Sequence, residues 1–207
     1  MRVEAFIQSV PKRQEITDRL AQQLRNSDVD DFQVLMQEPD HDPWQHFWRV
    51  FDAMKSSSAE LVIRLEDDAL ISPHLAHNSR TWPAVKRGTF GCGWLYSPPT
   101  CPADYAHKAR TRQPYRDKYL EGCVAVLFKR EDLDWIVDAA KTWARRNPIG
   151  YCYDLALSWA VYQKRNKHLW LHDPPIVEHD SRAASAFGHV IRGNNCTMGA
   201  FNPRFKR

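Results

Sequence analysis

The sequence has no run that approaches the roughly 20 consecutive apolar residues of a membrane-spanning helix. Residues 1–10 also lack the long apolar core of a secretory signal peptide. The cysteines are odd in number and have no close-paired spacing, which argues against both a disulfide framework and a cysteine-based zinc site; they are Cys92, Cys101, Cys123, Cys152 and Cys196. These absences predict a soluble protein in a reducing cytoplasm.

The chain also has little net charge for its size. The formal net charge of +4 and the isoelectric point near 8.8 are compatible with an anionic partner but do not identify one. With 207 residues, of which 43% are hydrophobic, the chain can bury a sizeable core, and its length favours one domain. We therefore predict one domain over residues 1–187 and a basic C-terminal tail over residues 188–207.

An apolar segment at residues 61–65 ends in the consecutive carboxylates Glu66, Asp67 and Asp68. Its length and β-branched content are typical of a buried strand in an α/β sheet, where ligands bind beyond the carboxyl ends of strands. Adjacent anions repel one another unless a cation lies among them, and Mg²⁺ or Mn²⁺ prefers oxygen ligands. The segment predicts a metal-phosphate site; the alternative is a solvated acidic turn.

The segments around the acidic motif alternate between strand and helix patterns. Strands are predicted at residues 3–10 and 32–36, and a helix at residues 14–25 has an apolar stripe of Ile16, Leu20 and Leu24. Asp42 followed by Pro43 predicts the start of a second helix. The resulting β-α-β-α-β order favours a mainly parallel sheet with right-handed crossovers.

Aromatic residues and one methionine recur at three- and four-residue steps along the second helix, which is more typical of core packing than of a ligand platform; the stripe is Trp44, Phe47, Trp48, Phe51 and Met54. Further along, we predict a short helix at 74–79, strands at 89–96, 122–128 and 169–171, and helices beginning at 131 and spanning 154–163. Gly91 and Gly93 indicate close contacts along the strand that contains them.

Residues 98–119 are rich in proline and polar side chains and predict a long loop. Arginine and lysine residues alternate there with tyrosines, a combination suited to contacting phosphates and stacking on bases. A long loop in a compact domain is often functional, although a solvated basic loop has the same composition.

The segment Arg64-Leu65-Glu66-Asp67-Asp68-Ala69 resembles the LEDD form of the DxD motif of GT-A glycosyltransferases, notably the group that contains lipopolysaccharide sugar transferases. The β-α-β-α order before the motif, the segment 121–126 as an acceptor-side strand, and Pro175-Ile176-Val177-Glu178-His179 extend the resemblance over residues 1–185. The acidic motif is its most specific part. The resemblance implies an α/β fold: one GT-A, Rossmann-like domain with a mainly parallel central sheet flanked by helices.

The resemblance also implies a nucleotide-sugar donor, with a UDP-sugar favoured, held through its diphosphate by Mn²⁺ or Mg²⁺. Asp68 and His179 would ligate the metal, Glu66 would approach the ribose or a metal-bound water, and Asp67 would lie at the donor. Architecture alone places the other donor contacts: Val10, Pro11 and Arg13 at the base and ribose, and Glu38 at the base. For His179 the alternative is a surface or core-edge histidine. The identity of the sugar, and inversion or retention, stay open.

A transferase that inverts the anomeric centre needs a base for the acceptor hydroxyl. Asp154, at the start of a predicted helix, is our first candidate, because members of this family often carry an acid at this stage of the fold. A helix N-cap is the alternative role for Asp154. Glu121 is the second candidate.

Three features make a soluble acceptor more plausible than a lipid-linked one: the short chain, the absence of a membrane-associating C-terminal segment and the basic loop. They favour a phosphate-carrying acceptor such as the hydroxymethylated pyrimidines in DNA that small phage-type transferases glucosylate, in the host cytoplasm if the protein is phage-encoded. Acceptor contacts are then expected from Arg110, Arg112, Tyr115 and Arg116. Two alternatives remain: transfer to a surface polysaccharide or lipid-linked sugar, and a non-catalytic nucleotide- or nucleic-acid-binding domain.

Overall fold

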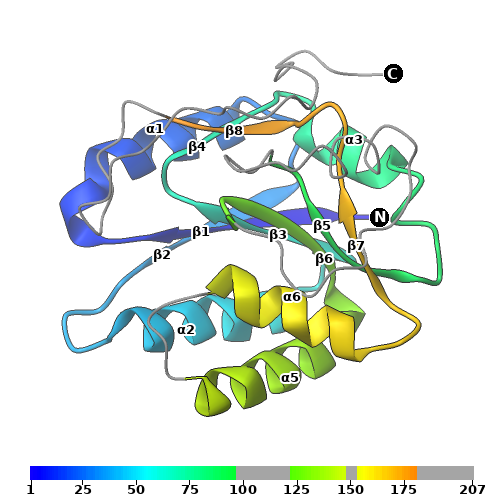
Figure 1. Ribbon diagram of the computed structural model, residues 1–207. Coiled ribbons are helices and arrows are strands. Elements are labelled where there is room, and N and C mark those ends of the chain that lie inside the picture. The colour runs from blue at the N-terminus through cyan, green and yellow to red at the C-terminus, as the bar shows by residue number, and fades with distance from the viewer. Residues whose placement is uncertain (97–121, 148–152, 181–207) are drawn as a thin grey trace.

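The computed structural model describes residues 1–96, 122–147 and 153–180. Its centre is a six-stranded sheet in the order β2-β1-β3-β6-β5-β7 (Figure 1). The strands are β1 (Val3–Ser9), β2 (Asp31–Met36), β3 (Leu61–Glu66), β5 (Phe90–Trp94), β6 (Ala125–Lys129) and β7 (His168–Leu171). β6 runs antiparallel to both of its neighbours, β3 and β5, whereas the other pairings are parallel. The mainly parallel sheet predicted from the alternation of elements is confirmed.

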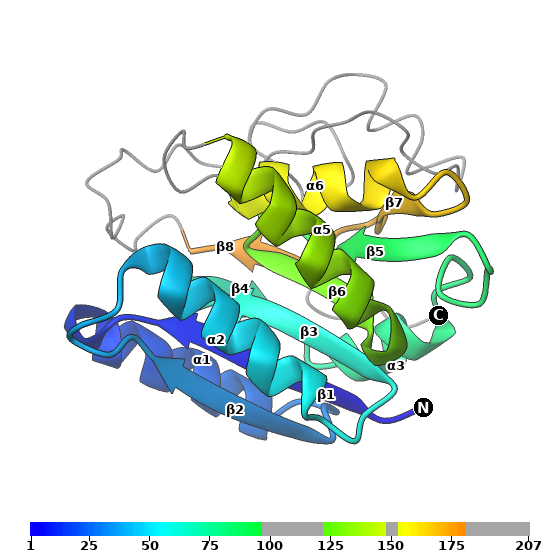
Figure 2. The same cartoon turned by 90° about the horizontal axis from the view of Figure 1, so that it is seen from below.

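Helices cover both faces of the sheet (Figures 1 and 2). One face carries α1 (Gln14–Arg25) and α3 (Leu75–Thr81), and the other carries α2 (Pro43–Lys55), α5 (Leu133–Arg146) and α6 (Tyr153–Gln163). On the α1 face lies a second sheet, in which β4 (Ala69–Ile71) pairs antiparallel with β8 (Val177–His179). Two short 3₁₀ turns, η1 (Pro11–Arg13) and η2 (Arg130–Asp132), precede α1 and α5.

Side chains that alternate along β1 and β3 divide the core into two clusters. Ala5, Ile7 and Leu65 face the cluster that contains Leu20 of α1, whereas Phe6 and Val62 face the cluster that contains α2, α5 and α6. By the same alternation, Gln8, Arg64 and Glu66 lie on the α2 face of the sheet. The pairing of Phe6 with Arg64 and of Gln8 with Glu66 sets these side chains beside one another.

The start of α2 follows the prediction from Asp42 and Pro43. Asp42 accepts a hydrogen bond from the Gln45 amide at 2.8 Å, and the Gln45 side chain accepts one from the Asp42 amide at 2.8 Å, which together form a capping box. The aromatic stripe is core, as predicted, because Phe47, Phe51 and Met54 are buried while Trp44 and Trp48 pack at the edge of the cluster.

Gly93 in β5 allows the sheet to contact Trp82. A Cβ atom at this position would lie within 2.6 Å of two ring atoms of Trp82, so a larger residue would collide with a buried indole. This is the close contact that a glycine within a strand indicates.

The strand predicted at residues 122–128 begins later, at Ala125. Gly122 has a φ of 75°, a left-handed conformation that is incompatible with a strand, and its amide donates to Asp154 Oδ2 at 2.8 Å. The helix predicted to begin at residue 131 begins with η2, and the helix predicted at 154–163 begins one residue earlier, at Tyr153. Within residues 1–96, 122–147 and 153–180, no helix is long and apolar enough to cross a membrane.

Candidate functional site

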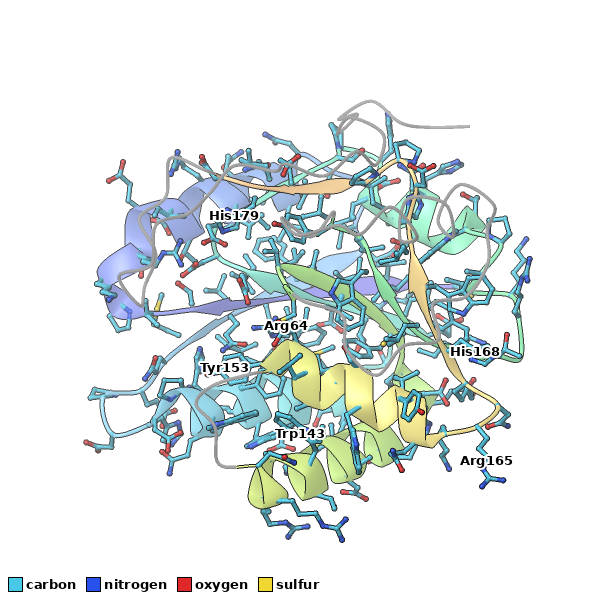
Figure 3. The ribbon with its side chains drawn as sticks, in the orientation of Figure 1. Arg64, Trp143, Tyr153, Arg165, His168 and His179 are labelled. Carbon is cyan, nitrogen blue, oxygen red and sulfur yellow. The ribbon has the colours of Figure 1, made fainter. Side chains whose placement is uncertain are left out.

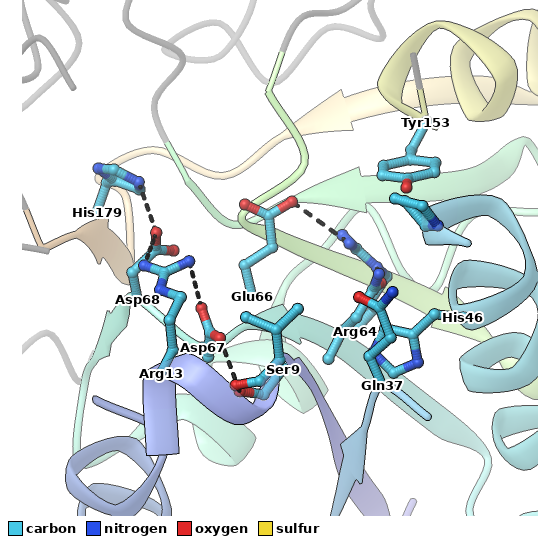
Figure 4. A pocket seen from close by; sticks show the side chains of 13 residues that line it. Ser9, Arg13, Gln37, His46, Arg64, Glu66, Asp67, Asp68, Tyr153 and His179 are labelled. Carbon is cyan, nitrogen blue, oxygen red and sulfur yellow. Dashed lines mark hydrogen bonds and ion pairs between the residues drawn. The ribbon is translucent and has the colours of Figure 1, made fainter. Parts of the chain in front are cut away.

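A cavity opens beyond the carboxyl ends of β1 and β3 (Figure 4). One end, which we call the acidic end, is lined by Ser9, Arg13, Asp67, Asp68 and His179; the other, which we call the arginine end, is lined by Gln8, Gln37, His46, Arg64 and Tyr153. Glu66 lies between the two ends. The cavity volume is about 150 Å³, below the roughly 300–1,000 Å³ of a complete small-molecule site. The described residues therefore provide part of a binding site for a ligand as large as a nucleotide.

Arg13 connects two carboxylates at the acidic end. Its Nη1 lies 2.7 Å from Asp67 Oδ1 and its Nη2 lies 2.6 Å from Asp68 Oδ2. Ser9 Oγ donates a further hydrogen bond to Asp67 Oδ2 at 2.7 Å. Arg13 is the last residue of η1, so the turn between β1 and α1 places its positively charged guanidinium at the end of β3. The three consecutive acids thus have the positive partner that their mutual repulsion requires.

His179 reaches the same cluster through the pairing of β4 with β8. Ala69, the residue after Asp68, pairs with His179, and the Asp180 amide donates to the Asp68 carbonyl at 2.7 Å. His179 Nε2 lies 3.1 Å from Asp68 Oδ2, the oxygen that also accepts from Arg13. The structure therefore brings together Asp68 and His179, the two predicted metal ligands, from distant parts of the chain.

The protonation equilibria at the acidic end depend on burial and on these partners. Burial raises the pKa of Asp67 to about 6, against the opposing effects of Ser9 and Arg13. Burial alone would also raise the pKa of Asp68, but the hydrogen bonds and charges of His179 and Arg13 outweigh it and lower this pKa below its ordinary value. Burial alone would lower the pKa of His179, but the hydrogen bond to Asp68 and the negative charges of Asp68 and Glu66 together outweigh it and raise this pKa. Asp68 is thus the stronger anion of the two aspartates.

Arg64 organises the arginine end of the cavity. Its side chain is 1% exposed, and Nε donates to Gln8 Oε1 at 2.8 Å. Nη1 donates to the Cys123 carbonyl at 2.7 Å, and Nη2 lies 3.3 Å from Glu66 Oε1. The guanidinium also lies 5.2 Å from the centre of the Phe47 ring. Through these contacts Arg64 holds the Glu66 side chain, at the end of β3, beside the segment that contains Cys123.

His46 and Gln37 add uncharged polar groups to the arginine end. His46 is buried, which lowers its pKa to about 4 and keeps the imidazole neutral near pH 7. Gln37 donates from Nε2 to the His41 carbonyl at 2.5 Å, so its carbonyl oxygen is not committed by this bond. The Tyr153 ring stacks on Phe47 with centroids 4.4 Å apart, and Figure 3 shows Tyr153 and Arg64 on the α6 side of the sheet. This end offers hydrogen-bonding groups and a ring rather than net negative charge.

Asp68 and His179 fit a divalent cation that arrives with other ligands. Asp68 Oδ1 is buried and has no hydrogen-bond partner among the described residues, as expected for an oxygen that would accept a cation. No group of three or more His, Cys, Asp and Glu side chains that could hold a metal occurs in that part of the chain. Mg²⁺ is commonly bound by one or two carboxylates together with water and substrate phosphates. The donor set therefore fits a metal brought in with a diphosphate.

Of the other residues proposed from the sequence, some line the cavity, some lie away from it, and some are outside the described residues. Val10 lines the cavity, whereas Pro11 does not. Glu38 also lies outside the lining and forms ion pairs with Arg49 at 2.9 Å and with His41 at 3.4 Å. Asp154 accepts from the Gly122 and Leu155 amides at 2.8 and 2.9 Å and is not part of the lining. Glu121 and the acceptor candidates Arg110, Arg112, Tyr115 and Arg116 lie outside the described residues.

Sequence reasoning did not select several residues that line the cavity, namely Gln8, Ser9, Gln37, His46, Arg64 and Tyr153. Arg64 had a signal that could have been used, because it is a cation within an apolar strand. The polar pair Gln8-Ser9 at the end of the first strand was a weaker signal of the same kind. His46 and Tyr153 had none, since each occurs within or beside an aromatic helix pattern.

No family model and no curated protein matches this sequence. Solved structures of glycosyltransferases do match the fold. A glycosyltransferase involved in the glycosylation of the major capsid of PBCV-1 is 12% identical, with a TM-score of 0.53, and the match covers 84% of this chain and 82% of that protein. The galactosyltransferase LgtC, solved with donor and acceptor sugar analogues, is 9% identical over 83% of this chain and 73% of LgtC, with a TM-score of 0.52.

The glycosyltransferase GlyE of Streptococcus pneumoniae TIGR4 is 7% identical, with a TM-score of 0.54. The match covers 86% of this chain but 54% of GlyE, so the chain spans about half the length of that protein. At such low identities the likeness concerns the fold. The chain has the α/β fold of GT-A type glycosyltransferases, and the fold predicted from the acidic motif and the element order is confirmed.

Proposed function

We propose that this protein is a glycosyltransferase that moves a sugar from a nucleotide-sugar donor to an acceptor hydroxyl. The observation that supports this best is the cluster of Arg13, Asp67, Asp68 and His179 beyond the carboxyl ends of β1 and β3. Ligands of open α/β sheets bind at this edge. In this chain that edge carries a carboxylate that would hold a cation beside an arginine that would bind phosphate.

The two ends of the cavity suit the two parts of a nucleotide. At the acidic end, Asp68 and His179 would hold Mn²⁺ or Mg²⁺ and Arg13 would contact the diphosphate, because a guanidinium binds phosphate oxygens in pairs. At the arginine end, Gln8, Gln37 and the neutral His46 would contact the nucleoside. A UDP-sugar is the favoured donor. Glu66 lies between the two ends and would contact a ribose hydroxyl.

The proposed chemistry needs a stabilised leaving group and an oriented donor. When bound, a divalent cation would neutralise the charge that develops on the departing nucleoside diphosphate. Arg13 would bind the same anion through its N–H groups. Arg64 would hold the Glu66 carboxylate in place, since its Nη2 lies 3.3 Å from that group and its other nitrogens are fixed by Gln8 and Cys123.

Asp154 and Glu121 remain the proposed bases for an inverting reaction. Asp154 has a second role in this proposal, because its carboxylate holds the Gly122 amide at 2.8 Å and thereby orients the residue that follows Glu121. A retaining reaction would need neither residue to take the acceptor proton. The anomeric configuration of the product, determined by NMR, distinguishes the two outcomes.

The test is a panel of sugar nucleotides incubated with the purified protein and Mn²⁺, with release of nucleoside diphosphate as the readout. We expect release with one donor, loss of release with EDTA and loss in Asp68→Asn. A non-catalytic nucleotide-binding domain would bind a nucleotide without releasing diphosphate from any donor and acceptor combination. That result would contradict the transferase proposal.

For the acceptor we propose a hydroxymethylated pyrimidine in DNA, supported by the basic, tyrosine-rich composition of residues 105–119. Mass spectrometry of hydroxymethylated DNA should then show one added hexose per modified base, and binding to this DNA should weaken steeply as salt increases. Absence of binding at low salt would contradict this acceptor. Transfer to a simple glycan instead would support the alternative of a polysaccharide or lipid-linked acceptor.

A further inference from the structure

We propose that Arg13 couples the binding of the divalent cation to the binding of the diphosphate. In the nucleotide-free protein its guanidinium occupies Asp67 and Asp68, and when a nucleotide binds it moves to the diphosphate and leaves Asp68 to the cation. The inference rests on the proposed function, because it concerns the same donor site. It adds a residue-level reason for the cation and the nucleotide to bind together.

The first support is the way in which the guanidinium bridges the acids. The two terminal nitrogens of Arg13 contact different carboxylates, Asp67 at 2.7 Å and Asp68 at 2.6 Å, and the side chain is 10% exposed. A cation shared by Asp67 and Asp68 would need the space between these oxygens. In this arrangement the positive charge of the protein itself already fills it (Figure 4).

The second support is that nothing else in the described part of the chain holds the guanidinium. Arg13 Nε is buried and has no hydrogen-bond partner there, whereas the terminal nitrogens contact only the two carboxylates. Asp68 Oδ1 likewise has no partner, although Oδ2 contacts both Arg13 and His179 at 2.6 and 3.1 Å. Both groups therefore keep binding capacity that a ligand would use.

The third support is the charge balance of the acidic end. A divalent cation placed beside Arg13 would meet a like charge in a partly desolvated site, which opposes its binding. A diphosphate brings negative charge and accepts a bidentate hydrogen bond from the guanidinium. Each ligand therefore removes an obstacle to the other, and thermodynamic linkage makes this effect reciprocal.

The fourth support is the position of Arg13 at the start of α1. Arg13 is the N-cap residue of this helix, and no side chain caps the helix there. The Gln14 amide already donates to the Pro11 carbonyl, so the attraction for an anion at this point comes from the helix dipole. A diphosphate at the start of α1 would lie next to the guanidinium, so Arg13 could change partners by a rotation of its side chain.

The test measures Mn²⁺ binding to the full-length protein by electron paramagnetic resonance, without and with saturating UDP. For the unmodified protein we expect UDP to tighten Mn²⁺ binding at least fivefold. In Arg13→Gln, Mn²⁺ should bind at least fivefold more tightly without UDP, and UDP should then tighten it less than twofold. Arg25→Gln is the matched control, because it removes the same charge from the last turn of α1, and it should behave like the unmodified protein.

Asp68→Asn should abolish Mn²⁺ binding with and without UDP, which assigns the signal to this site. If Arg13→Gln is folded, as judged by circular dichroism and thermal melting, and binds Mn²⁺ no more tightly than the unmodified protein, the coupling proposal is wrong. If this variant does not fold, Arg13→Lys replaces it, since lysine cannot bridge both acids. Mn²⁺ binding at least twofold tighter in Arg13→Lys supports the proposal, and unchanged or weaker binding contradicts it.

These measurements separate the inference from the proposed function because none requires sugar transfer. Cooperative binding of Mn²⁺ and UDP without transfer to any acceptor would support the coupling and contradict the transferase. Transfer by a protein whose Arg13→Gln variant has unchanged Mn²⁺ affinity would support the transferase and contradict the coupling. No Mn²⁺ binding with or without UDP would contradict the inference and the metal dependence of the transfer.

Discussion

Arg13 and Arg64 line opposite ends of one cavity, and both contact the acidic motif, yet they are held in different ways. Arg64 is 1% exposed, and each of its nitrogens has a partner from Gln8, Cys123 or Glu66. Arg13 lies at the end of a short turn and contacts only Asp67 and Asp68 among the described residues. Arg64 is thus held by a neutral side chain and a backbone carbonyl as well as by Glu66, whereas Arg13 is held only by carboxylates that a cation could also bind.

The difference indicates how one site can combine rigidity with exchange. A buried arginine with all its donors satisfied orients the groups around it, which here include Glu66. An arginine that is paired only with acids can change partners when the charge of the site changes. We therefore expect substitutions at the acidic end to affect ligand binding and turnover most strongly, and substitution of Arg64 to affect stability most strongly.

The largest effect is expected for Asp68→Asn at the acidic end. Removing this charge takes away the proposed metal ligand and the partner of both Arg13 and His179, so kcat/KM for transfer should fall by about 10²–10³-fold. Steady-state release of nucleoside diphosphate measures the change. Asp18→Asn on the exposed side of α1 is the control and should retain full activity. Equal activity of the two variants would show that the acidic end does not carry the chemistry.

The next largest effect is on the free energy of unfolding, which should differ between substitutions of Arg64 and of Arg13. Arg64→Met breaks a buried network and leaves Gln8, the Cys123 carbonyl and Glu66 without their donor, so the free energy of unfolding should fall by about 3 kcal/mol. Arg13→Gln should lower it less, by about 1–2 kcal/mol, because Asp67 keeps its hydrogen bond from Ser9 and Asp68 keeps His179. Urea unfolding at pH 7 measures both. Equal losses would remove the distinction drawn between the two side chains.

A smaller effect is expected from the pH dependence of His46. Burial lowers the pKa of this histidine from 6.5 to about 4, so the unfolded chain binds a proton over a pH range in which the folded protein does not. Its contribution to stability is complete above about pH 6.5 and is lost as the pH falls toward 4. Between pH 7 and 4.5, the unmodified protein should lose about 2 kcal/mol more stability than His46→Gln.

His172 provides the matched control for this measurement, because burial lowers its pKa to about 4 as well, and it packs against Trp82 instead of lining the cavity. His172→Gln should reduce the pH dependence of unfolding in the same direction. Only His46→Gln should also weaken the binding of UDP. If both variants bind UDP like the unmodified protein, His46 does not contact the nucleotide.

The smallest effect distinguishes two neighbours after β2. Gln37 lines the cavity, whereas Glu38 pairs with Arg49 and His41 at its edge. Gln37→Ala should raise the KM for the donor about fivefold, the loss expected for one hydrogen bond. Glu38→Gln should change it less than twofold. The opposite order in steady-state kinetics would return the base contact to Glu38.

Much of the fold could be predicted because it depends on local patterns. The apolar stripe of α1 and the Asp42-Pro43 start of α2 fixed the bounds of the first elements, and their alternation with strands predicted the parallel part of the sheet. The late start of β6 was not predicted; before it, Gly122 has a φ of 75° and its amide donates to Asp154. That contact joins distant segments and leaves no periodic signal.

The site was predicted only where its residues form a motif. The acidic motif predicted Asp68, and the resemblance placed Arg13 and His179 with the donor, but the ion pairs between them depend on sheet register. Arg64 and Gln8 meet because β1 and β3 pair in parallel with Phe6 opposite Arg64. A single sequence does not encode register in a form that can be read by pattern, so this half of the cavity was missed.

The pairing of β4 with β8 has a consequence for when the site forms. His179 reaches Asp68 only through the register that sets Ala69 opposite His179, so both segments must be in place before this contact exists. During synthesis, α1 and β3 leave the ribosome long before β8. Of the two basic partners of Asp68, Arg13 is therefore available throughout this interval, and His179 is added only when β8 pairs with β4.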